Sequence, residues 1–304
     1  MRASSPNVGA SWTTRFACTL SAFAFGLILT AASAVQADRG AAFTSIDFPG
    51  ADGTQAWGIN ARGDIVGRYF RAGVSHGYLL SGGELTTIDV PGASLTVAYG
   101  INDSGDIVGV CGMAGATHGF LFSGGSFTQI DVPGAQATQA IAINAPGDIV
   151  GLYTLAGVTH GYLLTGGQFT AIDFPCADAT APNGINPRGD IVGQYTLAGS
   201  IHGFVLSGGE FTFIDLPGAT LLLAAAIDPQ GGIVGRYDRA GKSHGFLLSG
   251  GEFTTIDIPG AGFTVARSIN PRGDIVGIYM TAGMFHGYLL SGLERHYWTE
   301  LRKE

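Results

Sequence analysis

Six histidines recur every forty-two residues in this chain of 304, which raises the question of a metal site. Imidazole nitrogen binds metal ions at about 2 Å, so a shared ion needs several rings close together. Equivalent positions in six successive repeats cannot all come that close. We therefore expect each histidine to bond locally, to a turn carbonyl or to a repeated aspartate. The histidines are His76, His118, His160, His202, His244 and His286.

Two series of aspartates recur with the same period and could in principle supply acid–base chemistry. One is invariant, at Asp47, Asp89, Asp131, Asp173, Asp215 and Asp257; the other holds Asp64, Asp106, Asp148, Asp190 and Asp274 but has Gly232 in the fifth copy. A catalytic pair is needed once and not six times, so we expect these carboxylates to accept backbone N–H bonds beside glycine turns.

Calcium binding at the Asn-x-x-Gly-Asp turns is an alternative, with Asn60 and Asp64 as donors, although Ca²⁺ takes six to eight oxygens. The chain has no Gly-x-Ser-x-Gly elbow, phosphate loop or Cys-x-x-Cys pair. The sequence predicts no catalytic residue, no metal and no cofactor.

The elements that carry these residues form a repeated unit whose copies start near residues 43, 85, 127, 169, 211 and 253. In the first copy we expect strands near 56–60, 64–69, 76–80 and 85–90, separated by an Asn-x-x-Gly turn, a Gly82-Gly83 hairpin and Pro91-Gly92. Helical periodicity is absent. Four antiparallel strands per repeat predict an all-β, six-bladed β-propeller. An open β-solenoid is the alternative.

Ring closure is predicted from the ends of the repeat region. The strand at 43–48 has no blade before it, and the matching strand is missing at 295–301, where the chain reads RHYWTEL. The amino-terminal strand is therefore expected to complete the last blade, which would remove two exposed sheet edges.

The repeat INxxGDIVGxYxxAGxxHGFLLSGG resembles the repeats of the "probable extracellular repeat, HAF family" over roughly residues 43 to 294. Members of that family carry an Asn-x-x-Gly turn, a Val-Gly strand and a His-Ala-Phe tripeptide, whereas this chain has His-Gly-Tyr or His-Gly-Phe. The resemblance implies export and a repetitive β architecture, and it implies no activity.

The ends of the chain predict export of one domain. Residues 1–37 read as a secretory signal peptide, with a retained membrane anchor as the alternative; residues 38–294 would be the propeller and 295–304 a tail. The mature chain would have 13 basic against 23 acidic residues, which argues against nucleic acid as a binding partner. It would have no apolar run long enough to span a membrane, so we expect no transmembrane segment. The localisation expected is secreted, extracellular or periplasmic. Whether Cys111 and Cys176 form a bridge stays open.

Positions that differ between copies are candidates for recognition. They lie after IDxPGA and between the second and third strands, two connections that should emerge on the same side, which we call the variable face. Near the start of the innermost strand the copies offer Trp57, Tyr99, Ile141, Asn183, Ala225 and Arg267. We expect a ligand site at this channel mouth, and neutral drift is the alternative. The predicted ligand-binding residues are Trp57, Tyr99, Asn183, Arg267, Arg71, Asp178, Asp238 and Arg239.

The leading hypothesis is a binding scaffold that takes a protein or glycan partner through the variable face. A hydrolase or lyase acting on an extracellular polymer is the alternative, and it would need an unrepeated acid such as Asp52, Asp178 or Asp238 at the channel mouth. A purely structural surface repeat is the third possibility.

Overall fold

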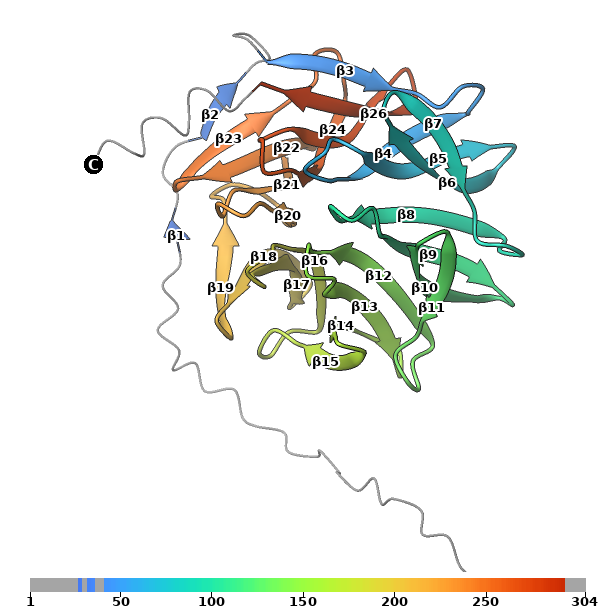
Figure 1. The fold of residues 1–304 in the computed structure, drawn as a ribbon. Coiled ribbons are helices and arrows are strands. Elements are labelled where there is room, and N and C mark those ends of the chain that lie inside the picture. Colours follow the sequence, from blue (N-terminus) through green and yellow to red (C-terminus); the bar gives the residue numbers. More distant parts are fainter. Residues whose placement is uncertain (1–26, 29–31, 36–40, 293–304) are drawn as a thin grey trace, which may run out of the picture.

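The computed structural model describes residues 27–28, 32–35 and 41–292, and every regular element in these ranges is a β-strand. The second to fifth repeats build units like that of the first, and Figure 1 looks along the axis around which the units are arranged. The first unit is β4 (Gly53–Ile59), β5 (Ile65–Arg71), β6 (Val74–Ser81) and β7 (Glu84–Ile88). The expected strands are thus confirmed, with bounds shifted by a few residues.

The remaining strands follow the same order from the axis outward. The second repeat gives β8 (Leu95–Ile101), β9 (Ile107–Met113), β10 (Ala116–Ser123) and β11 (Ser126–Ile130). The third gives β12 (Ala137–Ile143), β13 (Ile149–Leu155), β14 (Val158–Thr165) and β15 (Gln168–Ile172). The fourth gives β16 (Ala179–Ile185), β17 (Ile191–Leu197), β18 (Ser200–Ser207) and β19 (Glu210–Asp215).

The last two repeats contribute seven further strands. They are β20 (Leu221–Ile227), β21 (Ile233–Arg239), β22 (Lys242–Ser249), β23 (Glu252–Ile256), β24 (Phe263–Ile269), β25 (Ile275–Thr281) and β26 (Met284–Ser291). The strand β3 (Ala42–Ile46) precedes the first unit and pairs antiparallel with β26, from Gly287↔Ile46 to Ser291↔Ala42.

Two sequence motifs fit each other across the second and third strands of every unit. Gly67 of β5 lies opposite Tyr78 of β6. A Cβ on Gly67 would come within 2.7 Å of the Tyr78 ring and 2.0 Å of the Gln55 carbonyl oxygen, so only glycine leaves room for the aromatic. The Val-Gly strand and the His-Gly-Tyr/Phe strand are therefore complementary parts of one packing arrangement.

Both faces of each unit are apolar because the units are packed between neighbours. Ile65 belongs to the core formed with Ile46 and Tyr69, whereas the next residue, Val66, belongs to the core that includes Ala98 of the second repeat. Adjacent side chains on a strand point to opposite faces, so a pair of consecutive aliphatic residues serves two cores.

Hydrogen bonding groups the strands into five sheets, which corrects the expectation of a separate four-stranded sheet for each repeat. Three sheets have four strands, one has five and one has nine. The nine-stranded sheet arises because one parallel pairing, Ser243↔Phe263, joins the strands of the fifth repeat to those of the sixth. The other differences come from strands that precede β3.

Two short strands lie in the segment predicted to be a signal peptide. They are β1 (Leu27–Ile28), which pairs parallel with β19, and β2 (Ala32–Val35), which pairs parallel with β23. They lie along the outer edge of the fourth and fifth units (Figure 1). The rest of that segment and the 295–304 tail lie outside the described residues.

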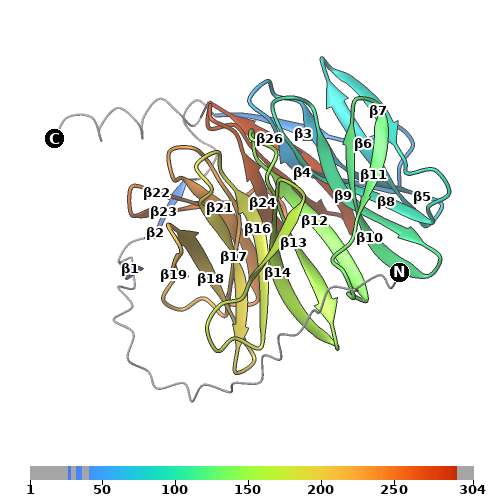
Figure 2. The same cartoon turned by 60° about the horizontal axis from the view of Figure 1, so that its bottom comes forward.

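The strand pairings place the two variable connections on one side of the molecule. Gly53 at the start of β4 pairs with Phe70 near the end of β5, and Arg71 pairs with Val74 across the following turn. The turn after β4 and the Gly82-Gly83 turn lie at the opposite ends of the same strands, and Figure 2 shows the strands from the side. The predicted sidedness of the variable face is confirmed.

Candidate functional site

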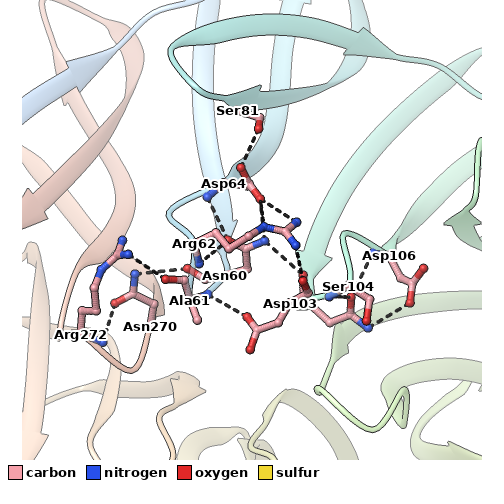
Figure 3. A network of polar contacts seen from close by, with 11 residues as sticks. Asn60, Ala61, Arg62, Asp64, Ser81, Asp103, Ser104, Asp106, Asn270 and Arg272 are labelled. Atoms are coloured by element: carbon pink, nitrogen blue, oxygen red, sulfur yellow. Dashed lines mark hydrogen bonds and ion pairs between the residues drawn. The ribbon is translucent and has the colours of Figure 1, made fainter.

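A ring of buried asparagine side chains connects the turns that follow the innermost strands. The Asn60 amide oxygen accepts the backbone N–H groups of Arg62 (3.0 Å) and Asp64 (2.9 Å). Its amide nitrogen donates to the Asp64 carboxylate (2.9 Å) and to the carbonyl of Asn102 in the next repeat (3.1 Å). Figure 3 shows this network. The side chain is only 3% exposed, so all of its polar atoms are satisfied inside the protein.

The same bond from asparagine to the next repeat recurs around the axis and includes the last repeat. Asn270 donates to the Asn60 carbonyl at 3.2 Å, across 210 residues of sequence. Arg272 likewise donates to the Ala61 carbonyl at 2.7 Å (Figure 3), so the arginine of an Arg-Gly-Asp tripeptide links neighbouring repeats. We call the side chains at this position the asparagine ring: Asn60, Asn102, Asn144, Asn186, Asp228 and Asn270.

These bonds correct the role expected for the aspartate of the turn. The Asp64 carboxylate accepts from the side chains of Asn60, Ser81 and Arg62, and it is the asparagine oxygen that accepts the backbone N–H groups. Burial alone would raise the pKa of Asp64, but the hydrogen bonds from Ser81, Asn60 and Arg62 and the charge of Arg62 outweigh it and lower the pKa.

The asparagine ring has one exception, in the fifth repeat, where Asp228 stands in place of asparagine. Its Oδ1 accepts the backbone N–H groups of Gln230 and Gly232, both at 2.8 Å, as asparagine does elsewhere. The other oxygen must then occupy the place of the amide nitrogen, where it cannot donate unless protonated. Gly232 removes the second carboxylate that would repel it. Burial raises the pKa of Asp228, which is 2% exposed.

The histidine prediction is confirmed in five repeats. His76 Nδ1 bonds to the Asp89 carboxylate at 2.7 Å, and His286 bonds to Asp47, which follows β3, at 2.7 Å. The other such pairs are His118–Asp131, His160–Asp173 and His244–Asp257. Each pair joins the third strand to the strand outside it, a structural role.

A second ring lies three residues before the asparagine ring, and a β-bulge creates it. The register between β4 and β5 shifts between Ala56 and Gly58, so Trp57 has no partner on β5. The same shift occurs in every repeat. A bulge leaves the extra residue unpaired and re-aims its side chain. We call these residues the bulge ring: Trp57, Tyr99, Ile141, Asn183, Ala225 and Arg267.

The bulge ring lines a central cavity of about 100 Å³ together with the residues that follow it on the six innermost strands. The prediction that Trp57, Tyr99, Asn183 and Arg267 come together is confirmed. Their expected place near the start of the strand is wrong, because Trp57 is the fifth residue of seven in β4 and lies toward the asparagine ring. The small residue after each ring position is the sequence signal of this crowding, since a Cβ on Gly58 would come within 2.7 Å of the Tyr99 carbonyl oxygen.

Arg267 dominates the electrostatics of this cavity. Its guanidinium lies 4.0 Å from the centre of the Trp57 ring, and Tyr99 meets the same ring edge-on at 4.8 Å. Burial lowers the pKa of Arg267 to about 10, so the group stays charged at neutral pH. Arg68, absent from the sequence prediction, lies 5.9 Å from the Trp57 ring on its β5 side and donates to Gln55.

The other predicted ligand residues do not line the cavity. Arg71 and Arg239 each donate to a proline carbonyl in the turn before the innermost strand, at 2.8 and 2.7 Å. The Asp178 carboxylate accepts the backbone N–H of Ala198, which fixes a hairpin turn. Asp238 forms an ion pair with Arg236 at 2.7 Å. These four residues hold the scaffold of the variable face.

The chemistry available in the cavity is binding and not proton transfer through a carboxylate or imidazole. Its lining contains no Asp, Glu or His, and Asp52 instead accepts the N–H of Ala72. Among the described residues no three metal-ligating side chains are grouped together. Cys111 is a buried free thiol, so it is not bridged to Cys176, and burial raises its pKa.

Comparison with solved structures identifies the class of the fold, a β-propeller. The β-propeller domain of the Trilobed protease from Pyrococcus furiosus matches with a TM-score of 0.53 and 11% identity, over 80% of this chain and 94% of that one. TolB from Acinetobacter baumannii matches with a TM-score of 0.53 and 13% identity, over 79% of this chain and 64% of TolB. At these identities the likeness concerns the fold alone.

A looser likeness, with a TM-score of 0.48 and 12% identity, relates 81% of this chain to 88% of virginiamycin B lyase from Staphylococcus aureus. No protein-family model and no curated protein matches this sequence. In the part of the chain that the structure describes, no helix is long and apolar enough to cross a membrane.

Proposed function

We propose that this chain is a binding scaffold that docks a protein partner on its variable face. The observation that carries the proposal is where exposed large apolar side chains lie. Of the seven among the described residues, all but Phe43 belong to the two variable connections. They are Val74, Leu95, Leu155, Val158, Leu197 and Met284, between 37% and 49% exposed.

The chemistry of these side chains favours a protein over a glycan. Aliphatic and thioether groups at hairpin tips bury well in an apolar protein interface. Sugar rings are usually held by flat aromatic faces and polar groups, and this set contains no aromatic residue. The opposite face carries Gly-Gly turns, which have no side chains, and the asparagine ring, whose polar groups are already hydrogen-bonded within the protein. It therefore offers a partner little apolar surface to bury.

The scaffold in this proposal is a six-bladed propeller closed by the amino-terminal strand. Support comes from the β3–β26 pairing, the His286–Asp47 contact and the bond from Asn270 to Asn60. Val276 of the last repeat also packs in the core of the first, as the equivalent valine does between the other repeats. Closure would hold the variable loops on one rigid disc.

Export and membership of the HAF-type extracellular repeats are part of the same proposal. Both depend on the residues of the repeat and of the 1–37 segment. A secreted or periplasmic location would make a partner on the cell surface or in the envelope accessible. Cell fractionation with amino-terminal sequencing of the mature chain tests this part, and a cytoplasmic, unprocessed chain would contradict it.

A photo-cross-linking residue at Leu197, compared with one at Glu210 on the opposite face, tests the docking face. Partners captured only from position 197 would be purified and their affinity for the intact chain measured. Replacing Leu155, Val158 and Leu197 by serine is then expected to weaken binding at least tenfold, about 1.4 kcal/mol.

Glu210→Ser is the matched control, since it changes an exposed residue of the other face. Equal capture from both faces, or unchanged affinity in the triple-serine variant with folding intact, would overturn the proposal. A glycan that binds the wild type and is lost on Trp57→Ala would place a separate recognition site in the central cavity and would leave docking on the variable face to be judged by the capture experiment.

A further inference from the structure

Arg267 differs from every other arginine in the described residues because it makes no hydrogen bond. The other seven each donate to a carboxylate, an amide oxygen or a backbone carbonyl. The Arg267 guanidinium lies 4.0 Å from the centre of the Trp57 ring. The residue as a whole is only partly buried and lines the central cavity, but its Nε is buried without a hydrogen-bond partner, so unused N–H donors are available to a bound group.

Unused donors gather at the same place. The Nε atom of Arg267 and the indole Nε1 of Trp57 are buried without a hydrogen-bond partner. The lining of the cavity holds no acidic side chain and Arg267 is its one charged residue, because Arg68, 5.9 Å from the Trp57 ring, lies outside the lining and donates to Gln55. The chain as a whole is acidic, with a formal charge of -8, so this positive site is local and not part of a basic surface.

We propose that the central cavity binds a carboxylate group with the Arg267 guanidinium as its counter-charge. The planar fork of a guanidinium matches the two oxygens of a carboxylate, and one formal charge suits a monoanion better than a phosphate dianion. The cavity of about 100 Å³ has room for such a group and a few atoms beyond it. Ile141 and Ala225 supply apolar wall on the remaining side.

Two sources present this chemistry: a small free carboxylic acid and the uronate of an acidic sugar. Acetate represents the first and glucuronate the second, and the methyl ester of glucuronate is the uncharged control. The site is independent of protein docking on the variable face, because its lining shares no residue with the exposed apolar set.

Trp57 provides the signal for the test. The chain's other tryptophans are Trp12 and Trp298. In a full-length variant that carries Trp12→Phe and Trp298→Phe, Trp57 is the only source of tryptophan fluorescence. Each carboxylate is titrated at constant ionic strength with chloride as the balancing anion. We expect a saturable change in emission with acetate, with glucuronate or with both, and none with the ester.

Arg267→Met is expected to weaken the response at least tenfold, and Arg267→Lys, which keeps the charge but loses the fork, to weaken it less. Arg71→Met is the matched control, because Arg71 also lies over aromatic rings but outside the cavity. Thermal unfolding checks that each variant folds.

Saturation by acetate would identify a free carboxylic acid as sufficient, and saturation by glucuronate alone would identify the sugar acid. The proposal is overturned if neither carboxylate gives saturation, if chloride competes equally well, or if Arg267→Met and Arg267→Lys both fold and bind as the wild type does. None of these results depends on finding the protein partner.

Discussion

The asparagine ring and the bulge ring are three residues apart on the same strands, yet they obey opposite rules. Asparagine occupies five of six positions in the first, and each side chain is bonded both within its turn and to the neighbouring repeat. The second has six different residues and includes buried donors without partners. Where backbone groups must be satisfied the residue is fixed; where the side chain meets a cavity it is free to vary.

The largest effect is expected from breaking the asparagine ring. Asn102→Ala removes two bonds that satisfy the backbone N–H groups of Ser104 and Asp106 and a bond to the Asn144 carbonyl. Buried polar groups without partners cost about 1–3 kcal/mol each, so we expect a loss of about 2–4 kcal/mol in the free energy of unfolding. Urea denaturation measures it, and a loss below about 1 kcal/mol would contradict the ring's role.

In the bulge ring, replacing Arg267 is expected to raise the free energy of unfolding, whereas Asn102→Ala lowers it. Replacing a partly buried charge that has no hydrogen-bond partner by an apolar residue removes a desolvation cost of several kcal/mol. The cation–π contact with Trp57 that is lost is worth about 2 kcal/mol. Arg267→Met is therefore expected to raise the free energy of unfolding by about 1–2 kcal/mol in carboxylate-free buffer. A clear destabilisation in the same denaturation assay would show that Arg267 supports the fold.

The substitution Asp228→Asn would place an asparagine at all six positions of the asparagine ring. Asp228→Asn should keep both bonds to backbone N–H groups and add a donor toward the Asn270 carbonyl, for a gain of about 1 kcal/mol at pH 7.

The gain should depend on pH. Burial raises the Asp228 pKa above its ordinary value of 3.8, so the contribution of Asp228 to the stability of the wild type is greatest below that value and is lost as pH rises through the folded pKa. The advantage of the asparagine variant should therefore shrink as pH falls toward 4. Unfolding midpoints of both proteins at pH 4, 5.5 and 7 test this, and a constant difference would argue against titration of Asp228.

The smallest effect is expected at Ile141, a half-buried residue of the bulge ring. Ile141→Ala removes atoms that face the cavity, so we expect a loss of about 0.5–1 kcal/mol, well under the 2–5 kcal/mol typical of a closed core. The change in unfolding midpoint measures it. A loss as large as that of Asn102→Ala would mean that both rings are structural.

The two rings also show how far sequence reasoning reached. The invariant histidines and aspartates were predicted to be structural, and their pairing is confirmed at His76 and Asp89. The role of Asn60 in linking repeats was not predicted, although the paired change to Asp228 and Gly232 was a visible signal. The bulge was missed because the small residue after each ring position, such as Gly58, does not by itself reveal a shift of register between strands.

The forty-two-residue period by itself determined the four-stranded unit, its turns and its variable side, because alternating apolar residues and positive-φ glycines act locally. Only the tertiary structure decided which variable residues meet. Trp57 and Arg267 are 210 positions apart in sequence, and the docking of the last repeat on the first is what places the guanidinium over the indole. Similarly, burial and the lack of a partner for Arg267 follow from the arrangement around the axis and from no feature of its own repeat.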